Sequence, residues 1–164
     1  MIELETERLN FRQWQGPDYP RIADFFSSEK DARHVGGIKN TEDSWRLMAT
    51  YIGHYELHGY SYLAIEEKET GSLIGTVGLW NSEPWPEPEL GYWLFPTFQG
   101  KGYGIEAGQA VKAFASDELN LDSLVSYIDS ENHPSIALAL RLGAKLDNTI
   151  DLLGFGPHQV YRYW

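Results

Sequence analysis

The sequence contains no cysteine and only two methionines among its 164 residues. The absence of cysteine excludes disulfide bonds, a thiol nucleophile and metal sites with thiolate ligands. No apolar run approaches the roughly 20 residues that a membrane-spanning helix needs. The N-terminal segment Met1–Glu5 has neither a basic cluster nor an apolar run, so we expect no signal peptide. These absences favour a cytoplasmic protein that does not enter a membrane.

Basic residues are scarce as well. The chain has 13 Lys and Arg against 24 Asp and Glu, which gives a formal net charge of −11. Because a nucleic-acid backbone requires a basic face, we expect no nucleic-acid partner. The acidic excess permits a cationic substrate such as an amine, although acidic surfaces also simply keep proteins soluble.

The hydrophobic content of 42%, with 14% aromatic residues, is sufficient for a full core. We therefore expect a single domain over residues 1–164. Apolar periodicity predicts a mixed α/β order of strand, two helices, three strands, helix, strand, helix and two strands. The second helix, from Thr41 to about Gly59, carries Trp45 at helical spacing, and we expect that side chain in the core. The predicted strands are 8–14, 60–66, 72–80, 87–95, 124–128, 145–152 and 158–163.

The most informative segment is Gln99–Gly104, which lies between the predicted strand Glu89–Leu94 and an amphipathic helix. Its three glycines allow a tight turn and leave the backbone amides open to a ligand. The helix that follows directs its free N–H groups and the positive end of its dipole toward the same loop. Strand, glycine loop and helix N-terminus together favour a site for a phosphorylated ligand.

The sequence of this loop has three other interpretations. Gly102–Ala107 fits the dinucleotide pattern G-x-G-x-x-A, with Asp129 as a candidate ribose ligand. Residues 96–101 separate that pattern from the strand, however, and too few strands follow for a doubly wound sheet. A P-loop is excluded because no Ser or Thr follows Lys101. The glycines could also mark only a tight strand-to-helix turn.

Several segments, taken in order, resemble the GNAT acetyltransferase superfamily. Gln99-x-x-Gly102-x-Gly104 is similar to its Q/R-x-x-G-x-G/A signature, and Asn132–Ala144 is similar to its N-x-x-S/A…L-G-F segment. Thr6–Arg12 and Glu89–Leu94 resemble the branch that acetylates the N-termini of ribosomal proteins. The resemblance implies the GNAT fold, a mixed and largely antiparallel twisted sheet of about seven strands, flanked by four helices, with a splayed central strand pair.

The resemblance further implies an acetyl-CoA-dependent N-acetyltransferase that acts on a primary amine, either a protein N-terminus or a small molecule. Main-chain groups of Leu94 and Phe95 would contact the pantetheine arm, and Asn132 would bind it through its side chain, unless Asn132 is only a helix cap. Lys101 could add a charge contact. The amides expected at the pyrophosphate are those of Gln99, Gly100, Lys101, Gly102, Tyr103 and Gly104.

Glu89 and Ser135 are the candidate catalytic residues. Glu89 begins its strand among tryptophans, and aromatic surroundings would raise the proton affinity of a carboxylate. Glu89 is therefore either the base, with Glu87 as the nearby competitor, or a surface glutamate beside the proline-rich connection. Ser135 is the polar group that the resemblance places near the sulfur, where it would protonate the leaving thiolate. Many relatives carry a tyrosine at the position of Ala139, so proton delivery by Ser135 or water is expected here. Gly91 is compatible with a bulge in this strand.

The candidate acceptor contacts are Trp80, Trp85 and Tyr92, and the acidic residues Glu83, Glu87 and Glu89 favour a cationic acceptor. His54 and His58 stand four residues apart on a helix, but no third ligand accompanies them, so we expect no metal. The aromatic end of the last strand makes either a monomer or a homodimer reasonable. Two alternatives to an enzyme remain, a non-catalytic acyl-CoA-binding module and a dinucleotide-binding protein.

Overall fold

The computed structural model describes residues 3–164, which form a seven-stranded sheet of order β1-β2-β3-β4-β5-β7-β6. All neighbouring strands are antiparallel except β4 and β5, which are parallel. This pattern confirms the predicted mixed, largely antiparallel sheet and does not fit the doubly wound parallel sheet of a dinucleotide-binding protein. The strands are β1 (Leu9–Arg12), β2 (Tyr62–Glu67), β3 (Leu73–Trp80), β4 (Glu89–Leu94), β5 (Val125–Ile128), β6 (Lys145–Asp151) and β7 (Pro157–Arg162).

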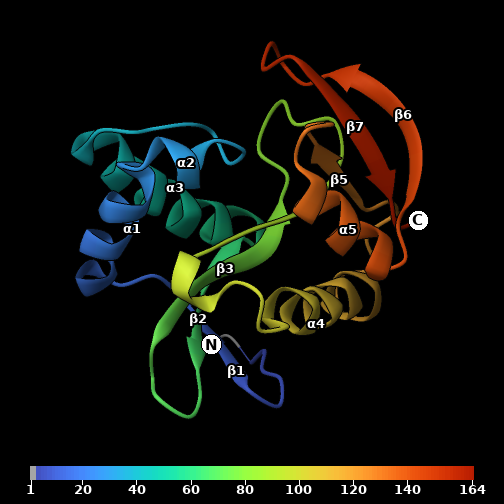
Figure 1. Ribbon diagram of the computed structural model, residues 1–164. Coiled ribbons are helices and arrows are strands. Elements are labelled where there is room, and N and C mark those ends of the chain that lie inside the picture. Colours follow the sequence, from blue (N-terminus) through green and yellow to red (C-terminus); the bar gives the residue numbers. More distant parts are fainter. Residues whose placement is uncertain (1–2) are drawn as a thin grey trace.

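Helices cover both faces of the sheet (Figure 1). Among residues 3–164 the α-helices are α1 (Tyr19–Phe26), α2 (Glu29–Ala32), α3 (Thr41–His58), α4 (Tyr103–Asp117) and α5 (His133–Arg141). Helices α1 to α3 lie on one side, and α4 crosses the other. The four predicted helices are present, and the one-turn helix α2 is additional; it is capped where the Ser28 hydroxyl accepts the Asp31 N–H. No helix in this part of the chain is both long and apolar enough to cross a bilayer.

The alternation of side chains along β4 assigns each one to a face of the sheet. Trp93 packs with Trp14 and Phe25 on the side of α1 and α3. Leu90 and Leu94 instead join the cluster that contains the buried residues of α4. Successive residues of a strand point to opposite faces, so β4 contributes to two cores at once.

Two expectations prove wrong. Trp45 is 54% exposed, because α3 buries the face that carries Met48 and Tyr51 and turns Trp45 to solvent. The pairing of β3 with β4 runs through Gly91 without a register shift, so Gly91 is not a bulge. A Cβ atom there would lie 2.1 Å from the hydroxyl of Tyr62, so the glycine makes room for that side chain.

The last strand lies inside the sheet, and the oligomeric state stays a prediction. β7 lies between β5 and β6, so it is not an edge that could extend the sheet into a second subunit. Its aromatic end is also used internally, because Trp164 Nε1 donates a hydrogen bond to the Leu121 carbonyl at 2.9 Å. The edge strand on this side is β6, whose residues are almost all exposed.

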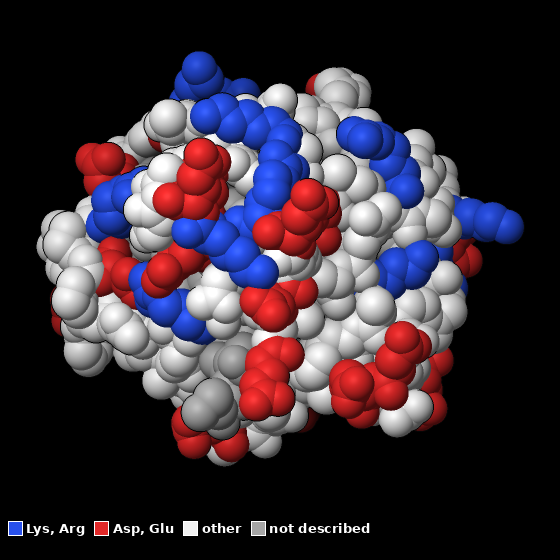
Figure 2. Space-filling model, turned by 90° about the horizontal axis from the view of Figure 1, so that it is seen from below, with Lys and Arg blue, Asp and Glu red and all other residues white. Residues whose placement is uncertain are grey.

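The lower face of the molecule carries interleaved basic and acidic side chains, which Figure 2 shows around the N-terminal part of the chain. This face therefore has no continuous basic surface. Elsewhere in the structure, opposite charges also meet in the ion pairs Arg8–Glu106 and Lys68–Glu5, at 2.6 Å and 2.8 Å.

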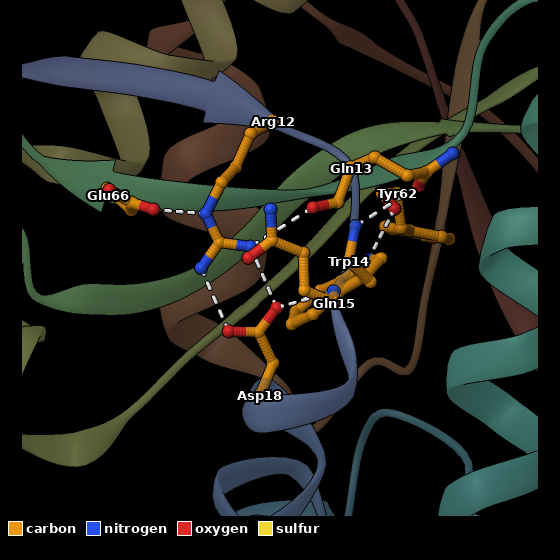
Figure 3. A network of polar contacts seen from close by, with 7 residues as sticks. All are labelled: Arg12, Gln13, Trp14, Gln15, Asp18, Tyr62 and Glu66. Carbon is orange, nitrogen blue, oxygen red and sulfur yellow. Dashed lines mark hydrogen bonds and ion pairs between the residues drawn. The ribbon is translucent and has the colours of Figure 1, made fainter.

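A buried ion pair joins β1 to α1. Asp18 is only 7% exposed, and its two oxygens accept hydrogen bonds from the Arg12 guanidinium at 2.7 Å and 2.8 Å. Arg12 also pairs with Glu66 on β2, and the Gln15 N–H donates to Asp18 (Figure 3). Burial alone would raise the pKa of Asp18, but these donors outweigh it and hold the pKa below its ordinary value.

Removal of Arg12 should therefore destabilise the fold. The substitution Arg12→Gln leaves the Asp18 carboxylate buried without its cation, which we expect to cost about 2–3 kcal/mol of unfolding free energy. Arg46→Gln is the matched control, because Arg46 forms an exposed pair with Glu42 and its loss should cost under about 0.5 kcal/mol. Urea denaturation at pH 7 measures both, and equal midpoints for the two variants would contradict this assignment.

Candidate active site

The strands β4 and β5 separate almost as soon as they meet. They share one register pair, Glu89 with Val125, beside the hydrogen bond from the Val125 N–H to the Pro88 carbonyl at 3.1 Å. A regular parallel ladder would continue with a bond from the Tyr127 N–H to the Leu90 carbonyl. That bond is absent here, so the two strands form the splayed central pair that the resemblance implies.

Side chains satisfy both partners of the missing bond. The Tyr127 N–H donates to the Glu89 carboxylate at 2.9 Å, and the Leu90 carbonyl accepts from the Ser126 hydroxyl at 2.6 Å. The Tyr163 hydroxyl lies 2.9 Å from Ser126 Oγ and completes the arrangement. Because these buried groups are paired without a ladder, the strands separate with little loss of hydrogen bonding.

A cavity of about 1,020 Å³ runs along this separation. It is lined from β4 by Glu89 and Tyr92, from the glycine loop by Gly102, and from α5 by Ser135. Its volume is at the upper end of the range for small-molecule sites. The sequence-predicted residues that line it are Trp80, Trp85, Glu89, Tyr92, Leu94, Gln99, Gly100, Gly102, Gly104, Asn132 and Ser135.

The glycine loop has the conformation that its composition predicts. Gly100 and Gly102 have φ angles of +74° and +81°, which other residues adopt only with strain. Gly102 is the N-cap of α4, so the first free N–H groups of that helix lie beside the cavity. A loop of this geometry can hold a phosphate without any charged side chain.

The Arg8 side chain, from the residue just before β1, holds this loop in position. Its Nε pairs with Glu106 Oε1 at 2.6 Å, and an Nη donates to the Lys101 carbonyl at 3.1 Å. The guanidinium also lies 4.3 Å from the centre of the Tyr103 ring. Arg8 thus neutralises Glu106 in the first turn of α4, where a carboxylate would repel an anionic ligand. No local sequence pattern indicates this role of Arg8, because residues 8 and 106 are far apart in the chain.

Three of the predicted cofactor residues do not line the cavity. The Phe95 N–H is bonded to the Ile74 carbonyl, and its ring packs under the Arg21 guanidinium at 4.1 Å. Lys101 is exposed, with its ammonium 5.6 Å from the ring of Phe98. The buried Tyr103 directs its hydroxyl to Glu67. Their backbone contacts with a cofactor remain predictions.

Gln99 has a structural contact in addition to its place at the cavity. Its Nε2 donates to the Leu94 carbonyl at 3.0 Å, so the side chain closes the end of β4. Leu94 itself lines the cavity. The glutamine of the predicted signature therefore links the strand to the glycine loop.

The start of α5 supplies the polar groups of the opposite wall. Asn132 occupies the N-cap position, yet its side chain makes no cap hydrogen bond, so the amide is not used as an ordinary cap. Ser135 and Tyr92 contact each other; burial raises the pKa of the Tyr92 hydroxyl, and the contact with Ser135 lowers it in part. Tyr92 thus lies on the α5 face of β4, whereas Trp80 and Glu89 lie on the other face. Ala139 is 2% exposed and lines the cavity without a polar group.

Glu89 is the buried carboxylate of the site. Burial raises the pKa of Glu89 to about 7, although hydrogen bonds from the Tyr127 N–H and from Trp85 Nε1 at 3.2 Å favour the charged form. Its competitor Glu87 is held by Arg162 through two bonds of 2.9 Å, which lower the pKa of Glu87. Only Glu89 of these two faces the cavity with a proton affinity suited to a base near neutral pH.

Aromatic side chains surround Glu89. Trp80 lines the cavity next to Tyr62 and is stacked on His54, with ring centres 4.0 Å apart. His54 is fully engaged, because Nδ1 lies 2.8 Å from the Tyr60 carbonyl and Nε2 accepts the Asn81 N–H at 3.0 Å. His54 therefore supports the Trp80 ring and has a structural role. Within residues 3–164 no cluster of three or more His, Asp or Glu residues is arranged to hold a metal ion.

Comparison with known proteins agrees with this geometry. The family model described as an acetyltransferase (GNAT) domain matches residues 8–145. An acetyltransferase structure from Agrobacterium tumefaciens superposes with a TM-score of 0.91 at 34% identity, and covers 100% of this chain and 95% of that one. An uncharacterized N-acetyltransferase p20 from Bacillus licheniformis is 30% identical over 84% of this chain and 79% of its own length.

A third similar structure is RimL, a ribosomal L7/L12 α-N-protein acetyltransferase solved in complex with coenzyme A. It has a TM-score of 0.77 at 19% identity, and the match covers 96% of this chain and 94% of that one. At this identity the likeness establishes a shared fold. The family match over residues 8–145 and the relatives of 30% identity or more establish the kinship: this chain belongs to the GNAT family of acetyl-CoA-dependent acetyltransferases.

Proposed function

We propose that this chain transfers an acetyl group from acetyl-CoA directly to a primary amine, with Glu89 as the base. The observation that carries the proposal is the position of Glu89. Its carboxylate is buried at the point where β4 and β5 separate, and it shares one cavity with the glycine loop and Ser135. Direct transfer requires a base, a held thioester and a group that receives the leaving thiolate, and this cavity offers a candidate for each.

The residues present fit acetyl-CoA. The N–H groups of the loop from Gln99 to Gly104 would hold the pyrophosphate, and the Asn132 amide, free of a capping bond, would bind the pantetheine arm. Between them, the unpaired edge of β4 near Leu94 offers main-chain groups for the same arm. Acetyl-CoA supplies the activated acetyl group.

The proton inventory of the reaction involves two ends of the cavity. Glu89 accepts a proton from the acceptor ammonium, directly or through water, and the free amine then forms the new bond to the acetyl carbon. The nitrogen proton that the amide product does not keep passes to water. As the carbon–sulfur bond breaks, Ser135 or water gives a proton to the sulfur. Tyr92, which contacts Ser135, can restore that proton. The proton for the sulfur thus comes from residues of β4 and the start of α5, and not from a tyrosine at position 139, where this chain has Ala139.

The acceptor enters on the α3 side of the sheet. Trp80 and Trp85 line that part of the cavity beside Glu89 and form its aromatic wall. We place Tyr92 with the thioester end because it lies on the other face of β4. Similarity to the fold of a ribosomal-protein acetyltransferase supports a protein N-terminus as one acceptor, and the aromatic wall supports a small amine as the other.

Replacement of the base should slow the chemistry without loss of the fold. For Glu89→Gln we expect kcat to fall by about 10²- to 10⁴-fold with little change in the KM for acetyl-CoA. The wild-type rate should rise with pH through about 7, because Glu89 must be deprotonated, and the variant should lack that limb. Glu83→Gln is the control, since Glu83 is exposed in the connection that joins β3 to β4, shortly before Glu89. Steady-state release of free thiol across a pH series measures both.

The same experiment separates the enzyme from a non-catalytic acyl-CoA-binding module. A module would bind acetyl-CoA but transfer its acetyl group to no amine. Transfer that survives Glu89→Gln with an unchanged pH profile would remove Glu89 from the mechanism while leaving the enzyme in place.

Removal of the loop's brace should weaken cofactor binding specifically. For Arg8→Gln we expect the Kd for acetyl-CoA to rise roughly tenfold, about 1.4 kcal/mol, because the loop loses its bond at Lys101 and Glu106 loses its counter-charge. Lys68→Gln is the matched control, as the Lys68 ammonium forms a partly exposed pair with Glu5 and not with Glu106 or the Lys101 carbonyl. Isothermal titration measures the affinities, and an unchanged Kd in Arg8→Gln would refute the positioning role.

A further inference from the structure

The acceptor end of the cavity has a charge opposite to that of the protein as a whole. One wall there is the segment from α2 to the start of α3, residues 29–40, which follows α1 in Figure 1. The charged side chains that this segment adds to the lining are three basic ones and one acidic one, Lys30, Arg33, Lys39 and Asp31. In the whole chain acidic residues outnumber basic ones by 24 to 13. The local excess of cations is therefore a feature of this wall.

Lys39 is the most enclosed of these cations. Its side chain is partly buried, and its ammonium lies 5.7 Å from the centre of the fully buried Phe26 ring. The ammonium also lies 3.3 Å from the position that a Cβ atom would take at Gly36. Gly36 has a φ of +105°, so glycine both permits this turn and leaves space for the Lys39 ammonium.

These cations are only partly neutralised within the protein. Arg33 has a long, exposed contact of 3.6 Å with Glu29. Lys30 and Lys39 take part in none of the ion pairs formed by residues 3–164. A partly buried ammonium without a carboxylate partner is well placed to bind an anion from a ligand.

The segment lies on the other side of the sheet from the expected phosphate site. In Figure 1, α2 lies on the same side as α1 and α3, whereas α4, which begins at the glycine loop, crosses the other side. The carboxylates that favoured a cationic acceptor are meanwhile unavailable, apart from Glu89. Glu87 is bound by Arg162, and Glu83 does not line the cavity.

We propose that the acceptor is an amine that also carries a carboxylate, with its ammonium at Glu89 and its carboxylate at Lys39. This inference rests on the proposed function. The shared chemistry has two sources, a free amino acid and a peptide N-terminus followed by acidic side chains. Glu89, Lys39 and the aromatic side chain of Trp80 all line the same cavity.

Matched acceptors test the proposal. We would measure kcat/KM for alanine against alaninamide, and for the amidated peptide Ala-Glu-Glu against Ala-Gln-Gln, with 1,3-diaminopropane as a cationic probe. We expect one carboxylated member to exceed its neutral partner at least tenfold, and the pair that shows it identifies the source. In Lys39→Gln this preference should fall to within about twofold, with the KM for acetyl-CoA unchanged. Lys145→Gln, on the exposed edge strand β6, should keep the preference.

The outcomes are distinguishable. Transfer to alaninamide, the neutral peptide or the diamine without a preference for carboxylate would overturn this inference and leave the proposed function standing. A rise in the KM for acetyl-CoA in Lys39→Gln, with the acceptor preference intact, would assign the cation to the cofactor and also overturn it. Absence of transfer to every amine would overturn the proposed function, and this inference with it.

Discussion

The functional architecture depends on one hydrogen bond that the sheet does not make. The Tyr127 N–H and the Leu90 carbonyl would pair in a continuous β4–β5 ladder, but each is bonded to a side chain instead. Glu89 and Ser126 thereby satisfy the buried backbone while the strands separate. The cavity, the free edge of β4 and the burial of a carboxylate all follow because side-chain hydrogen bonds replace this backbone hydrogen bond.

The same feature sets the electrostatics of the site. Glu89 is held in place by two donors in a region that water scarcely reaches, so its pKa rises to about 7 while its orientation stays fixed. At the other end of the cavity, Arg8 cancels the charge of Glu106 beside the glycine loop. A net charge of −11 therefore coexists with a local excess of cations where residues 29–40 line the cavity.

The sequence predicted features that local patterns encode. The strands, the four longer helices and the glycine loop follow from periodicity and from positive-φ glycines such as Gly102. Features that depend on distant residues were missed, including the brace from Arg8 to Glu106 and the Ser126–Leu90 bond. Trp45 was misplaced because helical spacing fixes a stripe but not which part of it faces the core. The position of β7 inside the sheet depends on chain topology, which its aromatic residues do not reveal.

The central claim is that the separation of β4 and β5 creates the binding site for acetyl-CoA. Thermal unfolding with saturating acetyl-CoA, with NAD in parallel, tests it most directly. A ligand at a hundred times its Kd stabilises a protein by about 2.7 kcal/mol, which corresponds to a shift of roughly 5–10 °C at this chain length. The account predicts such a shift with acetyl-CoA and none with NAD. An unchanged Tm with acetyl-CoA, or an equal shift with NAD, would contradict it.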